Sequence, residues 1–220
     1  MSAALAKQVS PRGTAVVELV SPFGEYYARN QRTIPPLLYA DMVVQSGVSF
    51  DAFGLRFQFG PPTDGSFVRD LFAVSALLDQ FSKLGKPLHI TGVEVPSQTG
   101  AWKGEDAAES GDANPKATSG GYWREPWNEP TQAEWLHRFY ELALSKPFVE
   151  SICWSGLWDA PPAAGEAIRD PAKGLSAPPR APVGAVLPGG LLRSDLAPKA
   201  SYKALLELRQ ELTGAVPAPS

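Results

Sequence analysis

The sequence predicts an α/β protein built on a parallel sheet, and three observations lead to that expectation. Four apolar, largely β-branched runs alternate with four helical patterns along the 220 residues. A helix that follows each strand is the usual crossover between neighbouring parallel strands. Hydrophobic residues make up 44% of the chain and charged residues 20%, which is ordinary for a folded protein and excludes a wholly disordered one.

The elements follow one another in the order β-α-β-α-β-α-β-α. The first strand, TAVVELV, has apolar residues on both faces, so we expect it to be buried. The strands are expected at residues 14–20, 50–59, 87–95 and 149–157. The helices are expected at residues 35–46, at 66–84, from 131 onward, and at 198–212.

Prolines, glycines and capping residues set the helix boundaries. Pro35 and Pro36 suit the first turn of a helix, and Gly47 ends it. Thr131 and Glu134 have the spacing of a capping box at the start of the third helix. Helical spacing also predicts which side chains face the core. These are Trp135, Leu136, Phe139, Tyr140, Leu142 and Ala143 in the third helix, and Tyr202, Leu205, Leu206 and Leu208 in the last.

Two long insertions interrupt this pattern, at residues 98–130 and 159–190. Both are rich in Gly, Pro, Ala and Ser, and they follow the third and fourth strands. Loops at the carboxyl ends of parallel strands are where such folds bind ligands, so we expect a functional site there. The domain prediction is an amino-terminal tail at 1–13, one folded domain at 14–213 and a carboxyl-terminal tail at 214–220.

Four residues at the strand ends are candidates for that site. Glu94 lies near the end of the third strand, where a carboxyl pKa is open to tuning; it is equally open to being simply solvated there. Trp154 and Trp158, with Asp159 adjoining, suit a sugar platform on which a ring stacks while the carboxylate accepts hydrogen bonds from hydroxyls. A core role fits Trp154 nearly as well, and Trp158 is the better ligand candidate.

The first insertion holds three further tryptophans and one motif. Trp102, Trp123 and Trp127 either pin this loop to the body of the protein or contact a ligand. The tripeptide that begins at Asn128, Asn-Glu-Pro, carries the general acid of many barrel glycosidases when it ends an apolar strand. Here no such strand precedes it and Thr131 follows at once, so we interpret the tripeptide as the turn that leads into a helix.

Composition and missing motifs exclude several functions. The net charge is −3, the isoelectric point is near 5.5 and no basic cluster is present, which argues against nucleic acid as a partner. No apolar run is long enough for a membrane span, and residues 1–12 lack a signal peptide's apolar core. The compartment stays open: cytoplasmic as the chain stands, extracellular if sequence precedes Met1.

Cofactors and metals are not expected. No Gly-rich phosphate loop and no Gly-x-Ser-x-Gly motif occurs, and His89 and His137 have no partners at ligand spacing. The single cysteine, Cys153, excludes a disulfide within one chain.

Four segments, in order, resemble glycoside hydrolase family 10, the endo-β-1,4-xylanases. The segment 51–58, DAFGLRFQ, is similar to that family's sixth strand, and 85–91, GKPLHIT, to the start of its seventh. Trp154 with 156–160, GLWDA, is similar to its eighth strand, and 190–205 to its last loop and helix. The resemblance implies a partial (β/α)8 TIM barrel whose four βα units correspond to strands five through eight.

The resemblance also implies a retaining mechanism with a carboxylate nucleophile and a carboxylic acid about 5–5.5 Å apart. Gly92 stands where the family has its nucleophile. Glu94 lies two residues, or about 6.6 Å, further along the same face. The second carboxylate could be Glu25, just beyond the first strand, or Glu18 within it.

Further residues become sugar-binding candidates through the same resemblance. Arg56 and Gln58 lie in the segment similar to the sixth strand, and Gln58 is nearest to the position of that family's histidine. With Trp154, Trp158, Asp159, Trp102 and Trp123 they complete the predicted substrate-binding set.

The functional hypothesis is a glycoside-hydrolase-like domain that acts on a β-linked plant polysaccharide such as xylan, with weak or no activity in this chain alone. The alternatives are a non-catalytic carbohydrate-binding relative and a half-barrel that dimerises for an unrelated task. Four strands leave two unpaired edges, so we also expect self-association.

Overall fold

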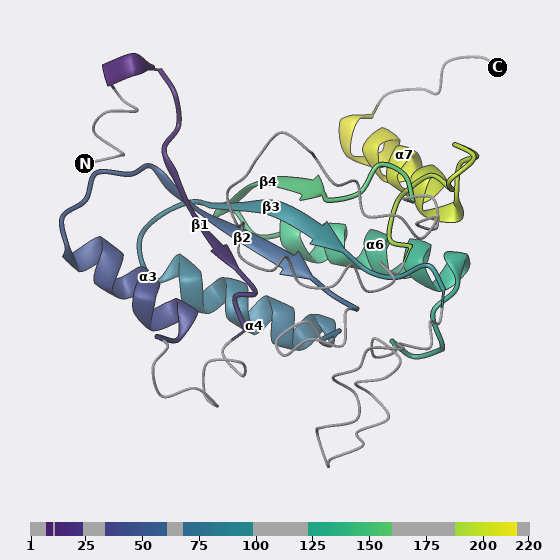
Figure 1. Ribbon diagram of the computed structural model, residues 1–220, viewed down its shortest axis with the longest axis horizontal. Helices are drawn as coiled ribbons and strands as arrows, with labels where there is room; N and C mark the ends of the chain where they lie inside the picture. The colour runs from purple at the N-terminus through teal and green to yellow at the C-terminus, as the bar shows by residue number, and fades with distance from the viewer. Residues whose placement is uncertain are drawn as a thin grey trace, which may run out of the picture.

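The computed structural model describes residues 8–10, 12–23, 34–60, 68–98, 123–159 and 188–214. Within them, four parallel strands form one sheet in the order β1-β2-β3-β4, and each strand is followed by a helix (Figure 1). The parallel α/β architecture is thus confirmed. The elements are β1 (Val16–Val20), α3 (Pro36–Gln45), β2 (Ala52–Gln58), α4 (Leu71–Ser82), β3 (Leu88–Glu94), α6 (Glu129–Leu144), β4 (Val149–Trp154) and α7 (Ala200–Thr213).

Local capping decides where two of the helices begin. The helix expected from residue 66 begins at Leu71, because Asp70 Oδ1 accepts a hydrogen bond from Ala73 N at 2.7 Å. The predicted capping box at Thr131 is wrong. Asn128 caps α6, its Oδ1 accepting from Thr131 N at 2.8 Å, so the helix begins at Glu129. Asn-Glu-Pro is therefore the start of a helix, as interpreted, but Asn128 rather than Thr131 provides the cap.

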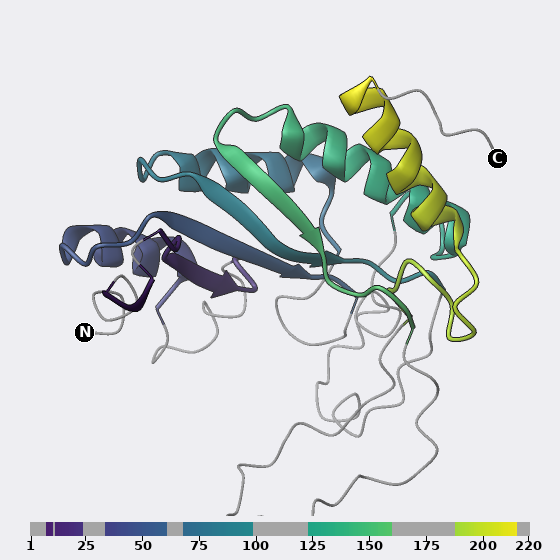
Figure 2. The same cartoon turned by 90° about the horizontal axis from the view of Figure 1, so that it is seen from above.

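One face of the sheet carries the core. The helices lie on the same side of the strands (Figure 2), and the hydrophobic side chains between the two layers form one buried cluster. Aromatic rings link the layers: Phe59 meets Trp135 edge-on with ring centroids 5.7 Å apart, and Trp135 stacks on Phe139 at 4.8 Å. The stripe predicted for the third helix makes this contact. Trp135, Leu136, Phe139, Tyr140 and Ala143 are buried, and Leu142 is half-buried against the core.

The other side of the sheet, which we call the open face, is polar and glycine-containing. It is formed by Val16, Glu18 and Val20 of β1, Gly54 and Arg56 of β2, His89 and Thr91 of β3 and Ser151 of β4. The expectation that the first strand is buried is wrong, because only Leu19 of β1 is buried. An edge strand covered by helices on one face keeps the alternate residues of its other face exposed.

The last helix differs from expectation at one position. Ser201 and Leu208 are its buried residues, whereas Leu206, expected on the buried side, is exposed. Leu206 lies two residues from Leu208, which places its side chain on the opposite side of a helix with 3.6 residues per turn. None of the described helices is both long and apolar enough to cross a membrane.

Candidate functional site

A bulge in β3 decides which side chains reach the carboxyl-end rim of the sheet. Leu55 of β2 pairs with Ile90, but Arg56 pairs with Gly92, so Thr91 is an extra residue in β3. The alternation of side chains shifts there: Ile90 is in the core before the bulge and Val93 after it. Glu94 consequently lies off the core, at the end of β3.

Two glycines accommodate the Glu94 side chain. A Cβ at Gly189 would overlap the Glu94 carboxyl group, and a Cβ at Gly156 would lie 3.6 Å from Glu94 Oε2. Burial raises the pKa of Glu94 above its ordinary value; the nearby negative charge of Asp159 adds to the rise and Lys199 opposes it. Within the described residues, no hydrogen bond reaches this carboxyl group.

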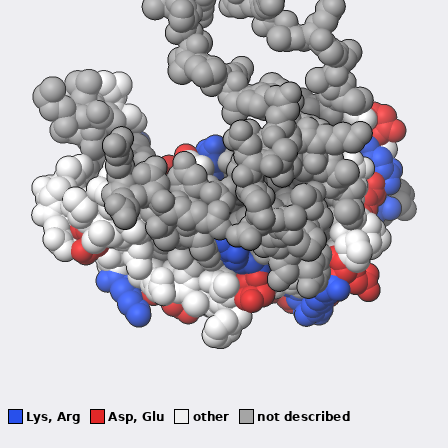
Figure 3. All heavy atoms as spheres, turned by 60° about the horizontal axis from the view of Figure 1, so that its bottom comes forward, with Lys and Arg blue, Asp and Glu red and all other residues white. Residues whose placement is uncertain are grey.

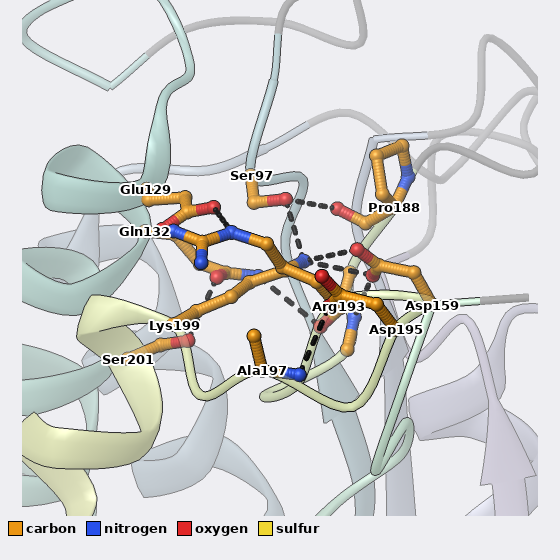
Figure 4. A network of polar contacts seen from close by, with 12 residues as sticks. Ser97, Glu129, Gln132, Asp159, Pro188, Arg193, Asp195, Ala197, Lys199 and Ser201 are labelled. Carbon is orange, nitrogen blue, oxygen red and sulfur yellow. Dashed lines mark hydrogen bonds and ion pairs between the residues drawn. The ribbon is translucent and has the colours of Figure 1, made fainter.

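The two charges that influence the pKa of Glu94, Lys199 and Asp159, form a buried ion pair, which Figure 4 shows. Lys199 Nζ is 2.6 Å from Asp159 Oδ2 and donates to Asp159 Oδ1 and to Ser97 Oγ, each at 2.7 Å. The Lys199 side chain is 1% exposed and that of Asp159 13%. Gly190 N also donates to Asp159 Oδ1 at 2.9 Å, so both carboxylate oxygens are engaged.

A buried glutamine fixes the segment 188–190 against the sheet. Gln132 Nε2 donates to Val95 O at 2.9 Å and to Gly189 O at 3.1 Å, while its Oε1 accepts from Ser201 Oγ at 2.8 Å. Trp154 Nε1 donates to the same Gly189 carbonyl at 2.9 Å. The residues that pack under Glu94 are therefore held by β3, β4, α6 and α7 together.

An exposed ion pair fastens the adjoining segment to α6. Arg193 Nε and Nη2 donate to Glu129 Oε1 and Oε2 at 2.7 and 2.8 Å, a two-bonded arrangement that fixes orientation (Figure 4). The glutamate of Asn-Glu-Pro thus binds an arginine. Leu192 in turn pairs by backbone with Leu157 and Asp159, which positions Trp158 between them.

The structure brings some of the predicted site residues together and separates others. Trp158 is 55% exposed beside the rim, and Trp154 is half-buried with its ring packed on the core. Asp159 is engaged by Lys199. Trp123 is buried in the core, with the Arg124 guanidinium 4.6 Å from its ring centre.

Arg56 and Gln58 lie on β2 at different distances from the carboxyl-end rim. Gln58 is exposed and pairs in register with Glu94, whereas Arg56 lies two residues before it and binds Glu18 at 2.8 Å. The Thr91 hydroxyl, more than Arg56, lowers the pKa of Glu18. Glu25 and Trp102 lie outside the described residues.

At the expected nucleophile position, the space is already filled. A Cβ at Gly92 would lie 2.7 Å from Ser155 Oγ and 3.4 Å from Arg56 Cγ. A side chain of any size there requires Ser155 to move, so Gly92 fits its surroundings as a glycine.

Sequence reasoning missed four residues of the site. Ser97, Gln132, Lys199 and Ser201 were assigned no role. One signal was present, since Gln132 lies three and four residues before Trp135 and Leu136 and so continues the buried stripe of α6. Lys199 gave no comparable signal, because only the folded chain brings it beside Asp159.

The described residues contain no group of His, Cys, Asp and Glu side chains that could hold a metal ion. His89 instead bonds Ser151 Oγ at 2.7 Å, and His137 lies beside Glu141 and Glu211. On the face drawn in Figure 3, basic side chains are interspersed with acidic ones.

Comparison with solved structures identifies the fold of this chain. No family model and no curated protein matches the sequence. Xylanase 10B from Thermotoga maritima matches over 96% of this chain and 52% of its own, with a TM-score of 0.53 and 18% identity. The fold is that of half a xylanase barrel.

Two further solved structures agree. A family 10 endoxylanase from a sugarcane soil metagenome has a TM-score of 0.55 at 15% identity, over 94% of this chain and 52% of its own. Xylanase 10B from Thermotoga petrophila, solved with xylobiose, has 0.52 at 17%, over 95% and 50%. The chain spans about half the length of each, which confirms the predicted partial (β/α)8 barrel.

Proposed function

We propose that the chain is a glycoside-hydrolase-like module that binds a β-linked polysaccharide such as xylan at the carboxyl-end rim of its sheet. The observation that carries the proposal is that the Glu94 carboxyl group and the Trp158 backbone pack against the same segment, at Gly189 and Gly190. The two are joined through Gly156, Gly189 and Gly190, whose missing side chains leave room for the Glu94 carboxyl group and for the backbone of Trp158.

The chemistry of the rim suits a sugar. The half-exposed Trp158 ring can stack on the C–H face of a pyranose, and a carboxyl group beside it can bond a hydroxyl. The rim lies at the carboxyl ends of parallel strands, where barrel folds bind their ligands. The xylobiose complex of the Thermotoga petrophila enzyme, which has this fold over half its length, supports xylose oligomers as the ligand class.

Binding is better supported than cleavage by this chain alone. Retaining hydrolysis needs two carboxyl groups about 5–5.5 Å apart. Asp159 is fully engaged by Lys199 and Gly190. Glu18 pairs in register with Gly54, four residues before Gln58, so it lies roughly 13 Å lower and two strands, about 10 Å, away from Glu94.

Hydrolysis remains the second candidate, and one observation favours it. Because burial raises the pKa of Glu94, this group keeps its proton to a higher pH than an ordinary glutamate, as a general acid must. Glu25, outside the described residues, is the second carboxylate that this mechanism would use.

Retention on insoluble xylan tests the binding proposal. We expect the wild-type chain to be retained and Trp158→Ala to bind about 10-fold more weakly, a loss of about 1.4 kcal/mol. Leu144→Ala is the matched control, because Leu144 is an exposed apolar residue at the carboxyl end of α6, which lies at the end of the sheet opposite the rim. Equal retention of the two variants contradicts a role for Trp158.

Release of reducing ends from soluble xylan separates the two candidates. Retention without new reducing ends supports binding alone. New reducing ends that disappear in Glu94→Gln support hydrolysis with Glu94 as the acid. If the wild-type chain neither binds nor cleaves xylan, both candidates are wrong.

A further inference from the structure

Both edges of the sheet are unpaired in the described part of the chain, since β1 pairs only with β2 and β4 only with β3. On β1, Ala15 O accepts from Asp51 N at 2.8 Å, and Ser21 N donates to Arg56 O at 3.1 Å. Backbone groups alternate in direction along a strand. The even-numbered residues 16–20 therefore direct their N–H and C=O groups away from the sheet.

The β1 edge lacks several of the features by which proteins protect an open strand. Its sequence, VVELV, contains no proline and no lysine, and its pairing with β2 has no bulge. Its one charge, Glu18, is already paired with Arg56. Such an edge is a template for another strand.

Exposed apolar side chains are concentrated on the elements at the two ends of the layer. β2, β3 and β4 have none, and α4 and α6 have one each, Phe72 and Leu144. The remaining exposed apolar side chains of the helices and strands lie in β1, α3 and α7. They are Val16 and Val20 of β1, Leu38, Tyr39 and Met42 of α3, and Leu206 and Leu212 of α7.

We infer that two copies of this chain associate through these edges and close an eight-stranded parallel barrel. Each copy has the fold of about half a xylanase barrel, with its helices on one face only. A two-fold axis along the barrel pairs β1 of each copy with β4 of the other. The helix order of a barrel then places α7 of one copy beside α3 of the other.

The two open faces provide most of the area that a stable dimer needs. Four strands of up to seven residues make a face of roughly 19 by 23 Å. The two open faces therefore cover about 900 Å² in total, before the two strand seams and the helices are added. A specific interface needs about 1,000 Å² or more.

Two pairs of polar side chains on the open face already have partners within one copy, whereas Thr91 Oγ1 is buried without a hydrogen-bond partner. Glu18 is paired with Arg56, and His89 is bonded to Ser151 within one copy. Burying groups that already have partners costs far less than burying unpaired ones.

Because all strands run parallel, both copies present their carboxyl-end rims at the same mouth of the barrel. The dimer would therefore carry two sets of Glu94 and Trp158 on opposite sides of the same mouth. This inference is independent of the proposed saccharide binding, because the experiment that tests it measures only the mass of the assembled protein.

Light scattering coupled to size exclusion tests the inference on the full chain at about 100 µM. We expect a species of twice 23.6 kDa that does not grow further with concentration, since a closed barrel has no free edge. A monomer, or a series of larger species, overturns the inference.

Two variants locate the interface. Val20→Lys places a charge at the β1 edge and should increase the dimer dissociation constant at least 10-fold, while Val48→Lys, at a loop position of similar exposure (49% against 45%), should not. Val16→Pro removes an outward-facing N–H and should act like Val20→Lys. Circular dichroism confirms that each variant is folded. A folded Val20→Lys or Val16→Pro that stays dimeric overturns the inference, and if neither folds, the wild-type mass decides.

Discussion

Two ion pairs of nearly equal length differ in everything that surrounds them. Lys199–Asp159 at the rim has N···O at 2.6 Å with side chains 1% and 13% exposed, whereas Arg56–Glu18 on the open face has 2.8 Å with 40% and 34%. Burial strengthens the attraction within a pair and raises the cost of losing one partner. The distance between two charges is therefore a poor guide to what their pairing contributes.

The surroundings explain how each pair is used. Lys199 and Asp159 have additional bonds to Ser97 and Gly190, so the rim pair joins β3, β4 and the start of α7. The Glu18–Arg56 pair joins only two adjacent strands that the backbone already holds. We expect the first pair to be structural and the second to be dispensable to a folded single copy.

The largest expected effect is that of Lys199→Met. The variant leaves the Asp159 carboxylate buried without its cation, which should lower the free energy of unfolding by about 3–5 kcal/mol. Urea denaturation measures the loss. Lys203→Met, an exposed lysine on the same helix, should change stability by no more than about 0.5 kcal/mol.

A double variant checks the cause. Lys199→Met combined with Asp159→Asn removes both charges and should recover part of the stability. If the double variant is as unstable as Lys199→Met, lost packing of the lysine stem rather than an unpaired charge explains the effect.

Next in size is Gly189→Ala. The new methyl group would overlap the Glu94 carboxyl, and the repacking should cost about 1–3 kcal/mol in unfolding free energy. Gly156→Ala is the control, because its nearest contact would be an ordinary 3.4 Å to Gly190 Cα. Similar losses in both variants would show that the Glu94 side chain moves aside freely.

A smaller effect, of opposite sign to the first, is expected from Glu94→Gln. The raised pKa means that the folded protein binds this proton more tightly than the unfolded chain does. The favourable contribution is complete below the ordinary pKa of 4.5 and is lost as pH rises through the folded pKa. Unfolding at several pH values should show Glu94→Gln more stable than wild type at pH 7, with the advantage shrinking toward pH 4.

The smallest effect is that of Arg56→Met. An exposed pair contributes about 0.2–1 kcal/mol and is weakened further by salt. Because the pKa of Glu18 is lowered, its contribution is present above pH 4.5 and lost as pH falls through the folded pKa. A stability loss in the single copy as large as that of Lys199→Met would break the comparison between the two pairs.

The order of elements could be predicted from the sequence, but several local assignments could not. The apolar runs predicted the strands, and the apolar stripe predicted the buried face of α6. Both patterns can be recognised in the sequence because periodicity is a property of neighbouring residues. The capping of α6 was assigned to Thr131 when two acceptable caps, Asn128 and Thr131, lie three residues apart. Which of the two residues caps the helix depends on the direction from which the preceding residues approach it, and the tertiary structure sets that direction.

The candidate site was predictable only in part. Glu94, Trp158 and Asp159 were found because they follow strands, and parallel strands end at one rim. Trp123 was ambiguous, since an aromatic residue in a polar loop suits either a ligand or the core, and its burial depends on the core cluster that distant parts of the chain form.

By itself, the sequence determined a parallel α/β chain of four repeating units, with a glutamate and a tryptophan at the strand ends. Only the tertiary structure decided that Lys199 neutralises Asp159, that Gln132 holds Gly189 and that Gly92 has no room for a side chain. The physical reason is the separation along the chain. Hydrophobic periodicity acts within a few residues, whereas ion pairs and side-chain contacts between residues 40 or more apart exist only once the chain has folded.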